Sequence, residues 1–541
     1  MNDNKFSCGP LMAVDALNRK VADETTAPTQ RKNRYVGMFY FLWLGETGRH
    51  KPLNVSEIVA ADPQAGYKPD SEVWGGIGTY HHWGEPFYGY YYSNDEWVVR
   101  RHMKLLIQAD IDFLFFDTTN GPTYDHNAKL VMRILDEYRA DGWKIPHVMF
   151  YTNTRSGMVA QRIYETFYKS NFCPETWFCY EGKPVIIAKE DECSEEVRSF
   201  FNIKRSQWPN EPDKVGGWPW MDFTRPQRVF VDDSGKPETI NVSVAQHPQL
   251  RFGDSALYGE KNNCGRAFHN GENDPDPNAY KYGYNFAEQF ERAIEVDPPI
   301  VLVTGWNEWI AGRWQGIPER PIMFVDCANY EYSRDLEMMR GGYFDNYFLQ
   351  LVDYVRKYKG IPAYLNAEDN YATYCNFNDG DFPREAEGYG QIYINKTQRN
   401  AITKVAVSCD GESLTFKITA KNKISEDRAG SWMRIYINTA QGEGYDYILN
   451  HQPDADGSTS LIKTVNGFEG VKIATASYVV CDNELEIRAR CSDMSLGESF
   501  TLWFKVADSN ETITCIEDFY DKGDAAPLGR LNYVYKYSKN K

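Results

Sequence analysis

The chain has 541 residues, of which 42% are hydrophobic and 25% are charged, as in ordinary globular proteins. A single core rarely grows to this length, so the sequence predicts two or three domains. The formal net charge of −17 argues against binding to nucleic acids and to anionic membranes, because both are themselves negatively charged. The aromatic share of 15% is high and fits two alternatives, bulky cores or flat faces on which sugar rings stack.

Eleven cysteines occur at irregular spacing, without the paired pattern of a zinc site. We therefore expect no metal and no cofactor. No stretch is apolar for long enough to span a membrane, and the N-terminal residues lack the apolar centre of a signal peptide. We expect a secreted, periplasmic or cell-surface protein whose export signal has been removed, with a cytoplasmic protein as the alternative. The oligomeric state stays open.

Residues 1–34 are polar and predict an N-terminal extension. Short apolar runs then alternate with segments of helical periodicity, which predicts parallel βα units. The runs with the composition of buried strands are residues 35–43, 111–117, 147–151, 184–188, 241–246 and 300–306. Residues 200–205 fit a seventh strand, and an eighth is not located. We predict a (β/α)8 barrel over residues 35–365, because no glycine-rich phosphate turn follows the first strand as it would in an open sheet.

The pattern changes between residues 361 and 388, and residues 366–387 are predicted to be a linker. Residues 388–541 then show strands of alternating apolar and polar residues, such as Leu414, Phe416 and Ile418, separated by turn-rich segments. Many short alternating strands predict a C-terminal β-sandwich.

Catalytic groups of such barrels lie where strands end and loops begin. Asp117 ends one predicted strand, and Glu308 follows another within the group Trp306, Asn307 and Trp309. Burial between two tryptophans and hydrogen bonding to an amide can tune the protonation of Glu308. We therefore predict Glu308 and Asp117 as catalytic residues, with helix capping as the alternative role. The other three residues are predicted to bind the substrate.

A polar and aromatic loop follows the first predicted strand, with the sequence TYHHWGEPFYGYYYSND. Sugar hydroxyls need hydrogen-bonding groups beside aromatic planes, so this loop is predicted to line a sugar site. Core packing and a metal site are the alternatives. The candidates are His81, His82, Trp83, Glu85, Tyr90 and Tyr91. We expect the substitution Trp83→Ala to weaken substrate binding and to leave the melting temperature nearly unchanged.

Further substrate-binding candidates come from other predicted strand ends and from an acidic stretch near residue 330. They are Asn120, Tyr151, Gln246, His247, Glu331, Arg334 and Asp335. Ion pairing is the alternative role for the acidic stretch, because it contains an arginine among its carboxylates.

The WNEW segment, residues 306–309, resembles the clan of glycoside hydrolase families 71 and 99, which act on α-mannans and α-glucans. The FYFLW run of the first strand and the HHWGEP loop are similar to that clan as well. The resemblance covers about residues 35–360 and implies a (β/α)8 barrel that hydrolyses α-linked sugars. It also implies two catalytic glutamates three residues apart, of which the first corresponds to Glu308 and the second to Ala311.

Ala311 carries no carboxylate, although glycoside hydrolysis normally needs two carboxyl groups. Asp117 is our first choice for the second group, and the others are Glu85, Asp326, Glu331 and Asp335. We therefore predict a glycoside hydrolase that acts on α-linked, mannan- or glucan-like oligo- or polysaccharide by acid/base catalysis centred on Glu308. The alternative is a carbohydrate-binding protein on a barrel without catalytic activity.

The C-terminal residues resemble the family-9-like carbohydrate-binding sandwiches that are attached to many polysaccharide hydrolases. The segments GSWMRIYINT, GYDYILN and GDAAPLGRLNYVY carry this likeness. It implies a carbohydrate-binding module in which Trp432, Tyr447 and Trp503 are candidate binding planes. Core packing is the alternative role for each of them.

Overall fold

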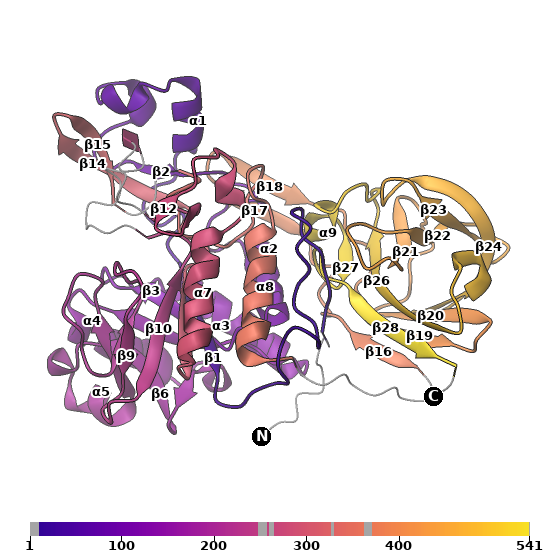
Figure 1. Cartoon of the computed structure of the whole chain (residues 1–541), viewed down its shortest axis with the longest axis horizontal. Helices are drawn as coiled ribbons and strands as arrows, with labels where there is room; N and C mark the ends of the chain where they lie inside the picture. The colour runs from indigo at the N-terminus through magenta and orange to yellow at the C-terminus, as the bar shows by residue number, and fades with distance from the viewer. Residues whose placement is uncertain (1–9, 247–256, 259–263, 326–328, 362–370, 540–541) are drawn as a thin grey trace.

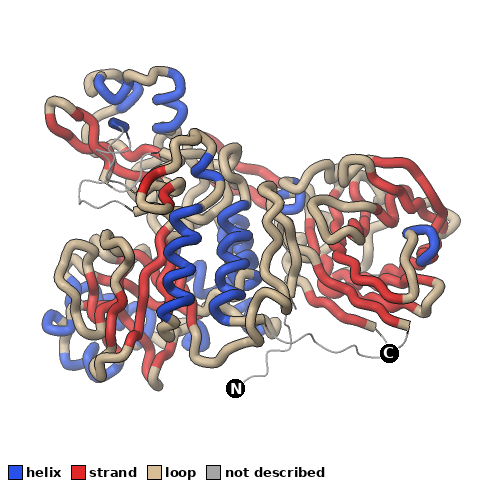
Figure 2. The backbone as a smooth tube through the Cα atoms, viewed as in Figure 1, coloured by secondary structure: helices blue, strands red, loops and turns tan. Residues whose placement is uncertain are grey.

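The computed structural model describes residues 10–246, 257–258, 264–325, 329–361 and 371–539. Figure 1 shows an α/β region and, at its right, a separate domain. Figure 2 shows that helices gather in the first region and that the second domain is built mainly of strands. The predicted α/β fold followed by a separate antiparallel β-domain is confirmed at this level.

Parallel strands form the wall of a nearly closed barrel. In chain order they are β1 (Tyr35–Tyr40), β3 (Phe113–Thr118), β4 (His147–Thr152), β6 (Lys183–Ala188), β7 (Asn202–Gln207), β8 (Gly217–Pro219), β10 (Pro237–Ser243) and β13 (Ile300–Thr304). Each strand pairs with the next except β8 with β10, and β13 returns to pair with β1. At the β8–β10 seam, the Thr239 hydroxyl donates to the Gly217 carbonyl and the Asn241 amide donates to the Trp220 carbonyl, each over 3.1 Å. Side-chain hydrogen bonds therefore join β10 to β8 and to the residue that follows it.

Each apolar run that predicts a strand overlaps an observed strand, and residues 200–205 overlap β7. The strand that the sequence does not locate is β8, which has only the residues Gly217, Trp218 and Pro219. Three residues are too few to show a period, and glycine and proline usually mark turns. Short strands of this composition therefore escape a search by hydrophobic pattern.

Helices cover the outer face of the barrel, and Figure 1 shows α7 and α8 side by side on it. They are α2 (Glu96–Gln108), α3 (Asp125–Ala140), α4 (Ser156–Ile163), α5 (Glu195–Phe200), α7 (Tyr284–Val296) and α8 (Asn346–Lys359). Among the described residues, no helix has the length and apolarity needed to cross a membrane. Phe39, Phe115 and Trp218 pack together inside the barrel, so its centre is a packed core.

A small lobe follows the carboxyl ends of β1 and β13, at the upper left of Figure 1. It holds α1 (Val55–Ala61) and an antiparallel sheet of β2 (Tyr80–His82), β14 (Ile310–Ile317) and β15 (Arg320–Phe324). The loops of two neighbouring barrel strands thus build one body. Other short strands are β5 (Cys179–Tyr180), β9 (Val229–Val231), β11 (Phe268–His269) and β12 (Glu272–Asn273).

The second domain is a curled antiparallel sheet with a short helix, α9 (Asp518–Asp521). Its strands are β16 (Ala372–Cys375), β19 (Ile402–Cys409), β20 (Ser413–Ala420), β21 (Ser431–Asn438), β22 (Tyr447–Pro453), β23 (Ser458–Thr464), β24 (Gly470–Cys481), β25 (Glu484–Arg490), β26 (Ser499–Ser509), β27 (Asp524–Ala526) and β28 (Tyr533–Ser538). In β20, buried and partly exposed residues alternate as the sequence predicts. The candidate binding planes Trp432, Tyr447 and Trp503 are all buried, so they pack in the core and present no flat face to a sugar.

A hairpin of β17 (Arg384–Gly388) and β18 (Gln391–Asn395) reaches back to the barrel domain. Tyr393 accepts a hydrogen bond from the Tyr90 amide over 2.7 Å. Arg384 forms a buried ion pair of 2.7 Å with Asp95, which also caps α2. Residues 371–387, which the sequence analysis assigns to a linker, therefore hold β16 of the second domain and β17 at the barrel.

Buried contacts also join the two domains directly. Asp345, just before α8, pairs with Arg530 over 2.7 Å and accepts a hydrogen bond from Tyr520 over 2.9 Å. Trp143 of the barrel domain stacks on Phe377 with ring centroids 4.1 Å apart. Charged and aromatic groups that lose water in this way fix the two domains against each other.

The described part of the N-terminal extension lies between the two domains, as Figure 1 shows in indigo. Met12 forms a backbone bridge with Asn532 of the second domain. The Leu11 carbonyl accepts a hydrogen bond of 2.6 Å from Arg356 of α8. The extension is therefore part of the folded structure from residue 10 onward.

Candidate active site

Glu308 lies at the carboxyl end of β13 and is 5% exposed. Its carboxylate accepts a hydrogen bond from Arg334 over 2.7 Å, within a buried ion pair. Its backbone amide donates to the carboxylate of Asp335 over 2.6 Å. Two consecutive residues thus hold the side chain and the backbone of Glu308, and this fixes the direction of its carboxylate.

The WNEW segment is also locked onto the end of β1. The side-chain amide of Asn307 accepts from the Phe41 amide over 2.9 Å and donates to the Phe41 carbonyl over 3.1 Å. β13 lies on one side of β1 and β3 lies on the other. Tyr40 of β1 is paired with Phe116 of β3, so the residues that follow them, Phe41 and Asp117, lie at the same level. Two strand spacings, about 10 Å, thus separate the strand ends that carry Asp117 and Glu308. The structure brings both predicted catalytic residues to one rim.

Asp117 continues the inward-facing positions of β3, since Phe113 and Phe115 both pack inside the barrel. It is 8% exposed and accepts hydrogen bonds from the Thr119 amide over 3.0 Å and from the Thr119 hydroxyl over 2.7 Å. Burial raises the pKa of Tyr124, and the negative charge of Asp117 raises it further. Tyr124 therefore lies near Asp117 on the rim.

An aromatic wall stands beside Glu308. The guanidinium of Arg334 lies 5.0 Å from the centre of the Trp220 ring, and Trp208 packs against Trp220 at 5.4 Å. The indole nitrogen of Trp220 is buried, and none of the described residues accepts its hydrogen bond. Trp220 thus offers an unused donor next to the arginine that pairs with Glu308. Trp220 is not among the residues that the sequence predicts for the site, although the two tryptophans of WPW are a visible signal.

Two predicted acidic residues have raised pKa values. Burial raises the pKa of Asp335 to about 6 and that of Glu331 to about 7. Glu331 accepts a hydrogen bond from the Ala267 amide over 2.9 Å. The Glu331 carboxyl therefore keeps its proton up to about neutral pH, which is the property that a general acid needs.

The raised pKa of Asp335 predicts a dependence of stability on pH. The folded state binds the Asp335 proton more tightly than the unfolded state does, and this stabilises the fold. The stabilisation is complete below pH 4 and is lost as the pH rises through about 6. Urea unfolding of the wild type and of Asp335→Asn between pH 4 and pH 8 measures this effect. The wild type is expected to lose stability relative to the variant as the pH rises from 4 to 6. If the unfolding free energies of the two proteins change with pH in the same way, the raised pKa of Asp335 is contradicted.

The aromatic loop after β1 is packed inside the protein, which corrects the prediction that it lines a sugar site. His81 lies against Trp74 and Phe324, and His82 lies between Tyr90 and Tyr389. Burial lowers the pKa of His81 to about 4 and that of His82 to about 3, so both rings are neutral at pH 7. These two histidines therefore pack in the core, which is the alternative role given above.

Trp83, from the same loop, is fully buried and stacks on Trp309 with ring centroids 4.3 Å apart. Its indole nitrogen donates to the Glu308 carbonyl over 3.0 Å. The expected result of Trp83→Ala is therefore a loss of about 3–5 kcal/mol of stability, and not an unchanged melting temperature. Thermal unfolding followed by circular dichroism checks this. If the melting temperature of the variant stays within a degree of the wild-type value, Trp83 does not act as a core residue, and the prediction that it lines a sugar site stands again.

The other predicted residues divide between the interior and the surface. Tyr91, Tyr151, Gln246, Trp306 and Trp309 are buried and make internal contacts, so they do not face a substrate. Tyr90 is also largely buried and bonds to Asn54, whereas Glu85 forms a surface ion pair with Arg340 over 3.1 Å, and Asn120 is exposed at the turn after β3. His247 and Asp326 lie outside the described residues.

Sequence reasoning also misses Glu337. This fully buried carboxylate accepts a hydrogen bond from the Tyr91 hydroxyl over 2.6 Å, contacts Nε2 of His102 at 2.9 Å and accepts a hydrogen bond from the Trp309 indole. It thereby anchors the second tryptophan of WNEW. The signal in the sequence is weak, because Glu337 stands among several other acidic residues. Within the described ranges, no group of three or more His, Cys, Asp or Glu side chains is arranged to hold a metal ion.

No family model matches the sequence, and a search of curated proteins finds no match. The fold is similar to the GH99 endo-α-mannosidase from Bacteroides thetaiotaomicron, at 14% identity and a TM-score of 0.35, over 60% of this chain and 97% of that one. A structure of the enzyme in complex with bis-tris-propane gives 14% identity, the same coverage and a TM-score of 0.33. Similarity this distant assigns no substrate and no residue role.

Proposed function

We propose that the protein is a glycoside hydrolase that cleaves α-linked oligo- or polysaccharide, with Glu308 as the central catalytic carboxylate. The observation that carries the proposal is the fixed position of Glu308 at the barrel rim, held by Arg334 and Asp335 beside Trp220. Catalytic residues of barrel enzymes lie at this end of the strands. The resemblance of WNEW supports a mannan- or glucan-like substrate.

The neighbours of Glu308 favour one of the two carboxyl roles. An arginine at 2.7 Å stabilises the ionised carboxylate, so Glu308 is suited to act as a base or to meet positive charge on the anomeric carbon. The leaving oxygen then needs a proton from a different group. Ala311 cannot supply it, and its backbone pairs with His81 inside the lobe.

Asp117 is our first candidate for the acid. If it protonates the leaving oxygen, Asp117→Asn is expected to slow the hydrolysis of natural glycosides by about 10²–10⁴-fold and to spare activated aryl glycosides, whose leaving groups need little protonation. Initial rates on both substrate types measure the difference. The hydrogen bonds from Thr119 favour the ionised form of Asp117, so equal damage to both substrates would shift the role to Glu331, whose pKa is about 7.

The second candidate function is carbohydrate binding without cleavage, and Ala311 is the observation that favours it. One experiment distinguishes hydrolysis from binding without cleavage. The wild type is incubated with a panel of α-mannans and α-glucans. Release of reducing ends that is lost in Glu308→Gln supports the hydrolase. Binding by calorimetry without any release supports the alternative.

We also propose that the protein works outside the cytoplasm, in a secreted, periplasmic or surface-bound form. Large polysaccharides do not enter cells intact, so an enzyme that cleaves them must meet them outside. Fractionation of producing cells, followed by immunodetection, tests this. Detection in the cytoplasmic fraction alone would contradict it.

A further inference from the structure

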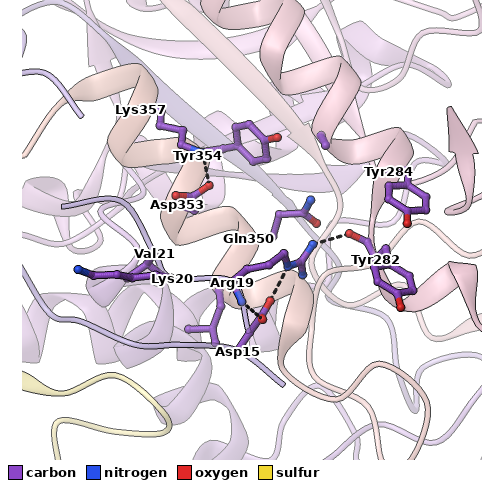
Figure 3. A pocket seen from close by; sticks show the side chains of 12 residues that line it. Asp15, Arg19, Lys20, Val21, Tyr282, Tyr284, Gln350, Asp353, Tyr354 and Lys357 are labelled. Atoms are coloured by element: carbon purple, nitrogen blue, oxygen red, sulfur yellow. Dashed lines mark hydrogen bonds and ion pairs between the residues drawn. The ribbon is translucent and has the colours of Figure 1, made fainter. Parts of the chain in front are cut away.

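A hollow of about 430 Å³ lies on the outer face of the barrel, between the N-terminal segment, α7 and α8 (Figure 3). None of the candidate active-site residues lines it. One face of α8 forms a wall, because Gln350, Asp353, Tyr354 and Lys357 follow one another at helical spacing. The volume is that of an ordinary small-molecule site.

The charges of the lining are balanced. Each lysine or arginine in it forms an ion pair with an aspartate, and this leaves no excess positive charge for an anion. The pairs are Arg19–Asp15, Lys20–Asp23 and Lys357–Asp353, with distances of 2.6, 2.9 and 2.7 Å. The hollow therefore suits an uncharged ligand.

Two polar atoms of the lining are buried without a partner among the described residues. Gln350 is 8% exposed, and its amide nitrogen donates to the Gly283 carbonyl over 3.0 Å, but no described group donates to its Oε1. Arg19 bonds to Asp15 and to the Tyr282 carbonyl, but its Nη2 has no acceptor. Figure 3 shows the side chains of Arg19 and Gln350 next to each other. Buried polar atoms normally have partners, and hydroxyl groups can both donate to the first atom and accept from the second.

A rigid aromatic surface borders the same hollow. The rings of Tyr282 and Tyr284 are stacked at 5.2 Å with an interplanar angle of 5°. His269 supports Tyr284 at 4.3 Å. Gly283 between the two tyrosines has a φ of +66°, which glycine adopts at no steric cost, and this turn brings both rings together. Flat aromatic faces of this kind suit the C–H face of a sugar ring.

We propose that this hollow is a second carbohydrate site, which binds a neutral hexose unit of an α-linked oligosaccharide without cleaving it. One sugar hydroxyl donates to Gln350 Oε1, another accepts from Arg19 Nη2, and the ring packs on Tyr282. The proposal does not depend on the proposed hydrolase activity, because binding can be measured where nothing is cleaved.

Calorimetric titration of the full chain tests the proposal, with maltotetraose and an α-1,6-linked mannotetraose as probes. The substitution Glu308→Gln is present throughout, so that turnover does not disturb the titration. We expect one of the two probes to bind at the hollow. Gln350→Met should lower the affinity of this probe about five- to tenfold, and Tyr282→Ala should abolish its binding. Tyr67→Ala, at a tyrosine that is 54% exposed on the lobe, is the matched control and should leave it unchanged.

A filling variant guards against a failure to fold. Ala287 lines the hollow from α7, so Ala287→Phe occupies the space without removing a hydrogen bond, and it should also abolish the binding. The proposal is overturned if no binding event of either probe is weakened by Tyr282→Ala and Ala287→Phe, and also if neither probe binds. Binding at the hollow in a protein that hydrolyses nothing would contradict the proposed function and leave this inference standing.

Discussion

Glu308→Gln is expected to lower the turnover number on α-linked oligosaccharides by about 10²–10⁴-fold. Glutamine keeps the shape of the side chain and can still accept the hydrogen bond of Arg334, but it carries neither the charge nor the basicity of the carboxylate. Substrate affinity should change much less than turnover, because the substituted group acts in the transition state. Initial rates of reducing-end release give both quantities.

The control for this experiment is Glu195→Gln on α5, whose side chain is 92% exposed and pairs with Arg198 on the same helix. It should keep the wild-type rate. A Glu308→Gln protein that is folded and equally active would remove Glu308 from the mechanism. A loss of activity together with a collapse of the melting temperature would instead point to a structural role of the Glu308–Arg334 pair.

Glu337→Ala is expected to cost about 3–5 kcal/mol of unfolding free energy. The substitution leaves the Tyr91 hydroxyl and the Trp309 indole without their buried acceptor, and it leaves His102 without its carboxylate contact. Urea unfolding monitored by tryptophan fluorescence measures the loss.

Glu337→Gln separates the hydrogen bonds from the charge. It keeps an acceptor oxygen for one donor, so it should lose less stability than the alanine variant. Glu484→Ala on the exposed side of β25 is the matched control and should stay within about 0.5 kcal/mol of the wild type. If Glu337→Ala behaves like Glu484→Ala, the buried network contributes little.

The features that the sequence predicts correctly are local. Strands such as residues 300–304 are buried on both faces and read as unbroken apolar runs, whatever lies beside them. The positions of Glu308 and Asp117 at the rim follow from where those runs end. The sequence alone therefore predicts that two carboxylates lie at the same end of the barrel.

The loop of residues 80–92 could not be interpreted in this way, because its burial depends on distant partners. Trp83 is covered by Trp309, and His82 by Tyr389, which follows more than 300 positions later. Composition alone does not distinguish an aromatic side chain that faces water from one that meets another aromatic ring. Trp220 escapes for a different reason, since it directly follows β8, a strand that is too short to be recognised.

The β17–β18 hairpin has a consequence for how such chains can be recombined. A protein whose C-terminal part is an independent domain can exchange it for another domain without loss of the first fold. Here the exchange would remove Arg384 and Tyr393, and with them the counter-charge of Asp95 and the acceptor of the Tyr90 amide. The barrel and its C-terminal companion therefore have to be inherited, shortened or engineered as one unit.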